Sequence, residues 1–247
     1  MTLHSPTLAS TGTAGDNSLD EARDILRLAV MTLFPGRIAL VSSFGAESAI
    51  LLHMISTIDP KVPVLFLDTG LHFPQTLAYR DELVTRLGLA DVRTVAPDDS
   101  AIAEADPQER LNSHAPDLCC ALRKVAPLEK ALGGFDAWIT GRKRYQGGAR
   151  QQLAYFEPDG KLIKVNPIAT WQPRHVRAYL TEHELPRHPL VTQGFASIGC
   201  YPCTSRVSPG EDQRAGRWRG LGKSECGIHG QAKEAIAALN QSLDPSI

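Results

Sequence analysis

Five cysteines are the residues of this sequence whose spacing most directly suggests chemistry. Cys119 and Cys120 are adjacent on a predicted helix, while Cys200 and Cys203 form a C-x-x-C pair on a predicted loop. Adjacent thiols diverge, which suits the separate irons of a four-iron cluster better than a single zinc ion. We therefore favour an iron-sulfur cluster on the two pairs; a tetrahedral zinc site and buried, unreactive thiols remain the alternatives.

Cys226 stands apart from the two pairs, in a stretch that also carries Arg214, Arg217 and Arg219. Nearby cations favour the thiolate, which is the nucleophilic form of cysteine. If metal occupies the other four thiols, Cys226 has no resolving partner in the chain, so an external, thioredoxin-like thiol must clear any sulfur-loaded form. The alternative is an exposed, spare thiol.

One loop between a predicted strand and a predicted helix is suited to an anion, because backbone N-H groups at a helix N-terminus can surround a phosphate or sulfate. Its candidate substrate-binding residues are Ser42, Ser43, Gly45, Ala46, Glu47 and Ser48. The sequence lacks the Walker lysine and the glycine pattern of dinucleotide folds, which disfavours ordinary nucleotide hydrolysis. Small residues that merely begin a helix are the alternative explanation.

Two further segments follow predicted strands, at the edge of a parallel sheet where ligands bind. Thr69 lies in a Leu-Asp-Thr-Gly turn, and Gly141, Arg142 and Lys143 belong to a basic run. Arg and Lys side chains at this edge are suited to recognise phosphate or sulfate. An ordinary strand-ending turn and a solvated basic surface are the corresponding alternatives.

The elements that must position these residues alternate along the chain. Predicted strands cover residues 37–44, 62–67, 92–95, 137–140 and 162–165, and predicted helices cover 19–33, 48–58, 75–87, 117–132 and 173–183. This alternation predicts an α/β fold with a mostly parallel sheet flanked by helices. We expect a disordered tail over residues 1–18, a nucleotide-binding domain over 19–198 that includes Cys119 and Cys120, and a functional C-terminal segment over 199–247.

The overall composition disfavours several partners. A formal net charge of -1 argues against nucleic acid and against an anionic membrane surface. No apolar run approaches the roughly 20 residues that cross a bilayer, and the N-terminal stretch lacks the pattern of a secretory signal, so we expect a soluble, cytoplasmic protein. Trp138 and the scattered histidines, including His72, are expected to be structural or surface residues.

Taken together, the motifs resemble one enzyme family over residues 37–230. They are Ser-x-Gly-Ala-Glu-Ser, Leu-Asp-Thr-Gly, Cys-Cys-x-x-Arg-Lys, Gly-Arg-Lys-Arg, Gly-Cys-x-Pro-Cys-Thr, Arg-Ala-Gly-Arg-Trp and Glu-Cys-Gly-Ile-His. In order and in cysteine pairing, this set is similar to the assimilatory adenylyl-sulfate reductases, within the wider phosphoadenylyl-sulfate reductase family. The resemblance implies an adenine nucleotide alpha-hydrolase-like (Rossmann-like) fold and one 4Fe-4S cluster per chain on the two cysteine pairs.

The resemblance also implies a reaction, in which reduced thioredoxin or a glutaredoxin-like donor reduces adenylyl sulfate to sulfite and AMP, in sulfate assimilation and cysteine biosynthesis. Cys226 matches the nucleophile, which forms an S-sulfonate in this family. Lys124 matches a lysine between cluster and substrate, and Arg214, Arg217 and His229 match groups that hold the sulfate. A homo-oligomer is compatible, since family members are often dimers or tetramers.

Three other functions stay open from the sequence. Phosphoadenylyl sulfate could replace adenylyl sulfate or be accepted beside it, although the resemblance to the family members that carry both cysteine pairs implies adenylyl sulfate. An ATP pyrophosphatase, such as a tRNA thiolase, would carry Ser-Gly-Gly and Asp-Ser in the first loop, where this chain has Phe44-Gly45-Ala46-Glu47-Ser48. A zinc-binding module in which Cys226 is incidental is the third.

Overall fold

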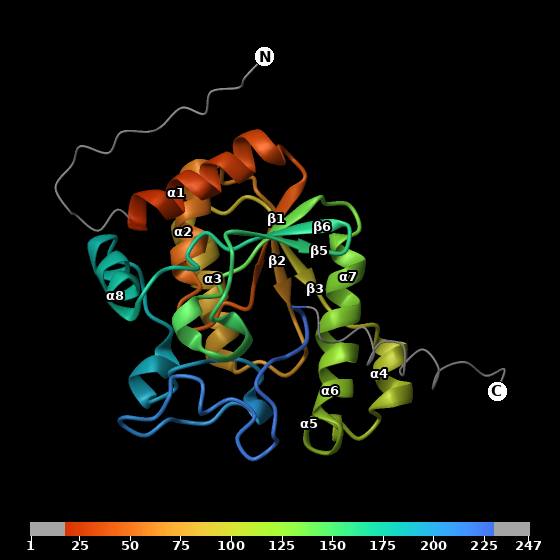
Figure 1. The fold of residues 1–247 in the computed structure, drawn as a ribbon. Coiled ribbons are helices and arrows are strands. Elements are labelled where there is room, and N and C mark those ends of the chain that lie inside the picture. The colour runs from red at the N-terminus through yellow and green to blue at the C-terminus, as the bar shows by residue number, and fades with distance from the viewer. Residues whose placement is uncertain (1–17, 230–247) are drawn as a thin grey trace.

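The fold is built around a six-stranded sheet with the strand order β3-β2-β1-β4-β6-β5 (Figure 1). The computed structural model describes residues 18–229. Its strands are β1 (Ile38–Ser42), β2 (Val64–Leu67), β3 (Val92–Val95), β4 (Ala137–Ile139), β5 (Phe156–Asp159) and β6 (Leu162–Val165). Neighbouring strands are parallel except for β5, which pairs antiparallel with β6. The chain passes from β5 to β6 in a tight turn in which Gly160 has a φ of 64°.

The central strands are apolar at nearly every position. All four residues of β2 and all three of β4 are buried. Such continuous apolar runs are typical of parallel strands that are covered on both faces. In β1 the side chains alternate, because Ile38 and Leu40 join the larger core while Ala39 joins a smaller core on the opposite face.

Helices cover both faces of the sheet (Figure 1). The face with the larger core is covered by α1 (Ser18–Leu28, continued by the π-helical turn Ala29–Leu33), α2 (Ala49–Ile58), α3 (Pro74–Leu87) and α8 (Pro173–Glu182). The other face packs against α7 (Ala126–Leu132), which continues from α6 (Pro116–Cys120) and the π-helical turn Ala121–Val125. Two short helices, α4 (Asp99–Ala105) and α5 (Leu111–His114), precede α6.

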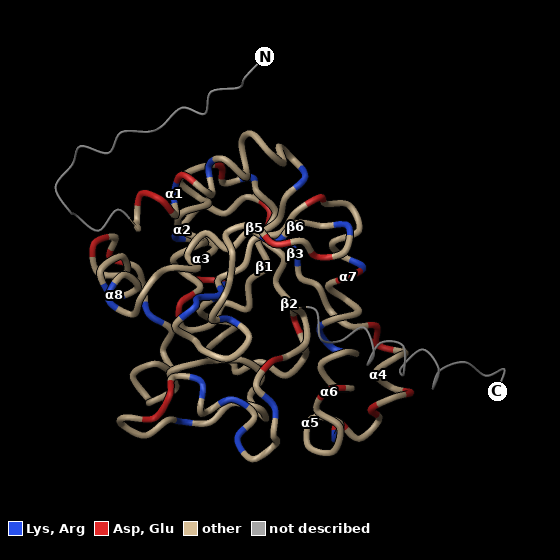
Figure 2. The backbone as a smooth tube through the Cα atoms, in the orientation of Figure 1, with Lys and Arg blue, Asp and Glu red and all other residues tan. Residues whose placement is uncertain are grey.

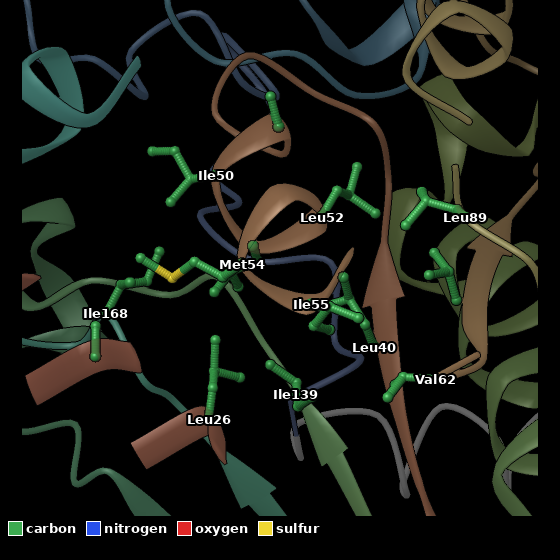
Figure 3. Close-up of a cluster of buried hydrophobic side chains, with 14 of the residues drawn as sticks. Leu26, Leu40, Ile50, Leu52, Met54, Ile55, Val62, Leu89, Ile139 and Ile168 are labelled. Carbon is green, nitrogen blue, oxygen red and sulfur yellow. The ribbon is translucent and has the colours of Figure 1, made fainter. Parts of the chain in front are cut away.

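The larger core is centred on α2 (Figure 3). Met54 of α2 extends toward Ile168, while Ile55 of α2 lies beside Leu40 of β1 and Ile139 of β4, and all five are buried. Burying one such side chain contributes about 1.5–3 kcal/mol. Because α2 is held this firmly, the loop that joins it to β1 has two rigid ends.

The predicted α/β class is confirmed, and each predicted strand and helix has a counterpart within a few residues. The short elements α4, α5 and β5 were not predicted. Ser18, predicted to belong to the tail, is instead the first residue of α1, and its carbonyl accepts a hydrogen bond from Trp171 Nε1 at 3.0 Å. The rest of the predicted tail (1–17) and residues 230–247 of the predicted C-terminal segment lie outside the described residues. Within the described part, no helix is long and apolar enough to cross a membrane.

Candidate active site

A cavity lies at the carboxyl ends of the parallel strands, where the loops after β1, β2 and β4 meet the C-terminal segment (residues 199–229). This is the edge at which open α/β sheets bind ligands. All the predicted substrate-binding residues line this cavity, together with Lys124, Cys200, Arg214, Arg217, Cys226 and His229. The remaining predicted site residues, Cys119, Cys120 and Cys203, do not line it. Figure 2 shows Lys and Arg positions recurring along the loops below the sheet in this view.

The loop after β1 contains a strained residue. Phe44 is fully buried, packs edge-on against Phe66 of β2 and has a φ of 47°. A bulky side chain rarely adopts this left-handed conformation, so the packing of its ring must hold the backbone there. The turn is tight, because Phe44 N donates to Ser42 Oγ at 3.1 Å and a Cβ at Gly45 would lie 3.1 Å from the carbonyl oxygen of Ile198.

Glu47 connects three parts of the cavity wall. Its carboxylate accepts hydrogen bonds from Lys143 Nζ at 2.7 Å, from Tyr145 Oη at 3.0 Å and from Gln213 Nε2 at 3.0 Å. Burial would raise the pKa of Glu47, but Lys143 and the other donors outweigh burial and lower it. Glu47 is therefore ionised and satisfied by protein groups.

The two cations that follow β4 are both in ion pairs. Lys143 is paired with Glu47, and Arg142 is paired with Glu157 at 2.5 Å while it also donates to Asn166 Oδ1 at 3.2 Å. Sequence reasoning assigned both cations to substrate recognition and did not foresee these partners. The unneutralised positive charge of the cavity must therefore come mainly from other residues.

The four paired cysteines come from two segments and are all buried. Cys119 and Cys120 end α6, while Cys200 precedes the 3₁₀ turn Tyr201–Cys203 and Cys203 ends it. Burial, followed by the nearby thiols of Cys120, Cys200 and Cys203, raises the pKa of Cys119 to about 12. The two pairs are thus near enough to influence one another electrostatically, and all five cysteines of the chain are free.

The donor set fits an iron-sulfur cluster by its chemistry. Four buried thiols are the ligands that such clusters take, one per iron. Burial raises the pKa of Cys120 to about 11, so ionising this thiol costs free energy. A bound metal cation would offset that cost. Within residues 18–229, no three His, Cys, Asp or Glu side chains already form a group that could hold one metal ion.

Lys124 is close enough to interact electrostatically with a thiol of each cysteine pair and with Cys226. It follows Cys120 by four residues on the π-helical turn and lines the cavity. Burial would lower the pKa of Lys124, but the facing thiols of Cys200, Cys226 and Cys120 outweigh burial and raise it. The ammonium is therefore charged. Conversely, burial would raise the pKa of Cys200, but Lys124 and the hydroxyl of Thr69, 3.3 Å from Cys200 Sγ, lower it.

The imidazole ring of His229 stacks on an aromatic side chain. Its imidazole stacks on the indole of Trp138, with centroids 5.4 Å apart and an interplanar angle of 3°. Burial, followed by the charges of Arg142 and Arg150, lowers the pKa of His229 well below its usual value. The imidazole is therefore neutral at physiological pH.

Several buried polar atoms around the cavity have no hydrogen-bond partner within the described residues. Two belong to predicted site residues, namely Nε of Arg217 and Nδ1 of His229, and two others are Nε1 of Trp218 and Nδ1 of His72. Buried polar groups are nearly always hydrogen-bonded, so atoms left unpaired in one cavity wall indicate a polar ligand there. Arg217 is a cation, which favours an anionic ligand.

Sequence reasoning missed several residues of the cavity wall. They are His72, Trp138, Gln146, Arg150, Gln213, Trp218 and Glu225. Trp138 is buried, as predicted, but it also forms part of the wall. Glu225 had a sequence signal, because it immediately precedes Cys226, whereas Arg150 and Gln213 lie in loops without periodicity and offered none.

The chain is similar to known proteins over most of its length. Residues 37–206 match the phosphoadenosine phosphosulfate reductase domain. A protein of Chelativorans sp. (strain BNC1) named adenosine 5'-phosphosulfate reductase is 50% identical over 201 residues, which cover 81% of this chain and 82% of that one. A protein of Gloeobacter violaceus named phosphoadenosine 5'-phosphosulfate reductase is 42% identical over 215 residues, with coverages of 85% and 89%.

A solved structure has a similar fold. The phosphoadenylyl-sulfate reductase of Candida auris, crystallised as a phosphate complex, matches with a TM-score of 0.62 and 27% sequence identity. The match covers 80% of this chain and 100% of that chain. The match supports the predicted fold, a mostly parallel sheet flanked by helices.

Proposed function

This chain belongs to the phosphoadenosine phosphosulfate reductase family, and from this premise we propose that it reduces adenylyl sulfate to sulfite and AMP in sulfate assimilation. The observation that carries the proposal is the position of Cys226, a free and half-buried thiol in a cavity wall shared with Lys124 and Arg217. Relatives at 50% and 49% identity are named adenosine 5'-phosphosulfate reductase, which supports the substrate without a 3'-phosphate.

In the proposed first step, the thiolate of Cys226 attacks the sulfur of the sulfate group. A bond forms between Cys226 Sγ and that sulfur, the bond from sulfur to the bridging oxygen breaks, and AMP leaves with the electron pair. The enzyme then carries an S-sulfonate. Repulsion between a thiolate and a sulfate is the main obstacle, and Arg217 and Lys124 would offset it by placing positive charge at the sulfate.

In the proposed second step, a dithiol donor such as reduced thioredoxin attacks Cys226 Sγ. The bond between the two sulfurs breaks and sulfite leaves, which forms a mixed disulfide with the donor. The donor's second thiol then resolves it, so the donor is oxidised and Cys226 is restored as a thiol. An external donor is needed because the other four cysteines are buried and are assigned to the cluster.

We also propose that Cys119, Cys120, Cys200 and Cys203 hold one 4Fe-4S cluster. The chemistry that the bound cluster would supply is electrostatic and structural rather than electron transfer, and Lys124 is the residue that would connect it to the substrate. His229 is neutral, so its orphaned Nδ1 is available to hydrogen-bond the sulfate end without adding charge.

The deciding experiment is anaerobic incubation of the full chain with adenylyl sulfate labelled with radioactive sulfur, without any thiol donor. We expect one label per chain on the peptide that contains Cys226, and release of labelled sulfite when reduced thioredoxin is added. Cys226→Ser should take up no label. Label on a different residue, or none on the wild type, would refute the proposal.

One alternative substrate has a specific observation in its favour. The Gloeobacter violaceus relative, 42% identical, is named phosphoadenosine 5'-phosphosulfate reductase. Comparing kcat/KM for the two nucleotides on the same preparation decides between them. A value at least tenfold higher for phosphoadenylyl sulfate would overturn our choice of substrate while leaving the Cys226 chemistry intact.

A further inference from the structure

We propose that Glu225 is the positioning residue of the catalytic segment, defined here as residues 222–229, and that Arg150 clamps it. The inference rests on the proposed role of Cys226, which is the next residue in the chain. It assigns Arg150 and Arg214 to holding this segment across the cavity. Arg217 and Lys124 are then the cations that face the substrate.

The clamp is a two-pronged ion pair between distant segments. Arg150 Nε and Nη2 donate to the two carboxylate oxygens of Glu225 at 2.6 and 2.7 Å, across 75 residues of sequence. The side chains are only 11% and 15% exposed. Parallel hydrogen bonds of this kind restrict orientation as well as distance, so they fix the carboxylate in one place.

Arg214 makes a second attachment next to the first. Its Nη2 donates to the carbonyl oxygen of Ser224 at 2.7 Å and lies 3.4 Å from a carboxylate oxygen of Glu225. The two guanidiniums therefore hold both the main chain and the side chain directly before Cys226. The pKa of Glu225 is lowered because Arg150 and Arg214 outweigh the effect of burial.

The catalytic segment depends on such side-chain attachments. Within residues 18–229, no backbone-to-backbone hydrogen bond involves residues 222–229. Its other side-chain attachments include the ion pair of Lys223 with Asp117, the stack of His229 on Trp138 and the packing of Ile228 against the smaller core. A segment without a backbone ladder is free to move unless its side chains are fixed.

All three guanidinium nitrogens of Arg150 already donate to protein side chains, which separates it from Arg217. Its third donor group, Nη1, is hydrogen-bonded to Gln146 Oε1. Arg217, in contrast, lies with its guanidinium 4.4 Å from the centre of the Trp218 ring and has an unpaired buried Nε. Each guanidinium nitrogen of Arg150 thus already donates to a protein acceptor, whereas Arg217 keeps an unpaired buried Nε–H for a bound anion.

The test measures how fast iodoacetamide alkylates Cys226 in substrate-free, full-length enzyme, quantified by mass spectrometry of its peptide. Two single variants, Glu225→Gln and Arg150→Gln, each remove one side of the clamp. We expect both to raise the rate about tenfold, as loss of a partly buried charge pair frees the segment. The double variant should be no faster than the faster single variant, because one clamp cannot be broken twice.

This pair of variants separates positioning from a purely electrostatic effect on the thiol. Removing Glu225's negative charge alone would favour the thiolate and speed alkylation, whereas removing Arg150's positive charge alone would disfavour it and slow alkylation. Rates that move in opposite directions, or that equal the wild-type rate in both variants, overturn the proposal. Glu211→Gln is the matched control, since Glu211 forms a similar pair with Arg219 on the exposed surface and should leave the rate unchanged.

A second readout uses single turnovers, and a separate series of rates over a range of adenylyl sulfate concentrations gives KM. We expect S-sulfonate formation in Glu225→Gln to slow about tenfold while KM changes less than threefold, since the substrate-facing cations remain. A rise in KM alone would instead make Glu225 part of the substrate site and overturn the positioning role. Failure of the proposed function is distinguishable, because alkylation of Cys226 is measured without any nucleotide.

Discussion

The imidazole of His229 lies parallel to the indole of Trp138, with ring centroids 5.4 Å apart. Trp138 is itself anchored, because its Nε1 donates to Asp159 Oδ2 at 3.0 Å and Lys164 Nζ lies 5.4 Å from its ring centre. The Trp138 indole therefore contacts residues of β5 and β6 on one side and His229, the last described residue of the site, on the other. A residue assigned to the core by its sequence context thus also orients a residue of the cavity wall.

We predict that Trp138→Phe preserves more activity than Trp138→Leu. Phenylalanine keeps a flat ring for His229 and loses the hydrogen bond to Asp159, which costs about 1 kcal/mol of stability. Leucine removes the stacking surface as well, so the rate of S-sulfonate formation should fall at least tenfold. Thermal unfolding and single-turnover rates measure the two effects separately. Equal rates for both variants would show that stacking does not orient His229.

We predict that the position of the Arg217 guanidinium requires a glycine at position 199. A Cβ at position 199 would lie 2.3 Å from Arg217 Nη2, so Gly199→Ala must displace the guanidinium. The far end of an arginine moves easily, and we expect stability to change by less than about 1 kcal/mol while kcat/KM falls about tenfold.

Gly216→Ala is the matched comparison for this prediction. There the added Cβ would lie 2.2 Å from the backbone oxygen of Ser205, which cannot move without disturbing the loop. We expect a loss of about 1–3 kcal/mol of stability, seen as a lower thermal midpoint. If Gly199→Ala instead destabilised the fold as much as Gly216→Ala, the first effect would not be specific to Arg217.

Metal content should separate the two roles of cysteine. Anaerobically purified protein is expected to contain about four iron atoms and four acid-labile sulfides per chain. Cys119→Ser and Cys203→Ser should lose iron, whereas Cys226→Ser should keep it and lose sulfite production. Zinc without iron in the wild type would contradict the cluster, and loss of iron from Cys226→Ser would contradict the division of roles.

His188 should make the fold less stable in mild acid. It is fully buried, its Nδ1 accepts from Leu190 N at 3.2 Å, and its Nε2 is 3.0 Å from Thr76 Oγ1. Burial lowers the pKa of His188 to about 4. Between pH 6.5 and 4 the unfolded chain binds a proton that the folded chain does not, so stability rises with pH there and falls on acidification, by at most about 1.4 kcal/mol per pH unit.

The corresponding measurement is the thermal midpoint at pH 7.5 and at pH 5.5 for the wild type and for His188→Gln. The midpoint of the variant should fall less on acidification, whatever its absolute value. His114→Gln changes an exposed histidine and should keep the wild-type difference. An identical acid effect in His188→Gln and the wild type would contradict the assignment.

Much of the site could be predicted because its signals are local. The loop after β1 follows from an apolar run, small residues and a helix pattern that are contiguous in the chain. The two cysteine pairs and the isolated Cys226 are visible as spacing alone. In contrast, the short edge strand β5 contains Pro158 and two acidic residues, so its strand propensity is weak and only its pairing with β6 reveals it.

The sequence by itself determined the alternation of strands and helices, the sheet edge that carries the site and the chemical types of its residues, because periodicity and motif spacing are properties of neighbouring positions. Only the tertiary structure decided which charges neutralise one another. Lys143 is paired with Glu47, and Arg150 with Glu225, through contacts that span 96 and 75 residues. Such pairs leave no local signal, since a cation in a loop has the same sequence context whether it meets a carboxylate, a substrate or water.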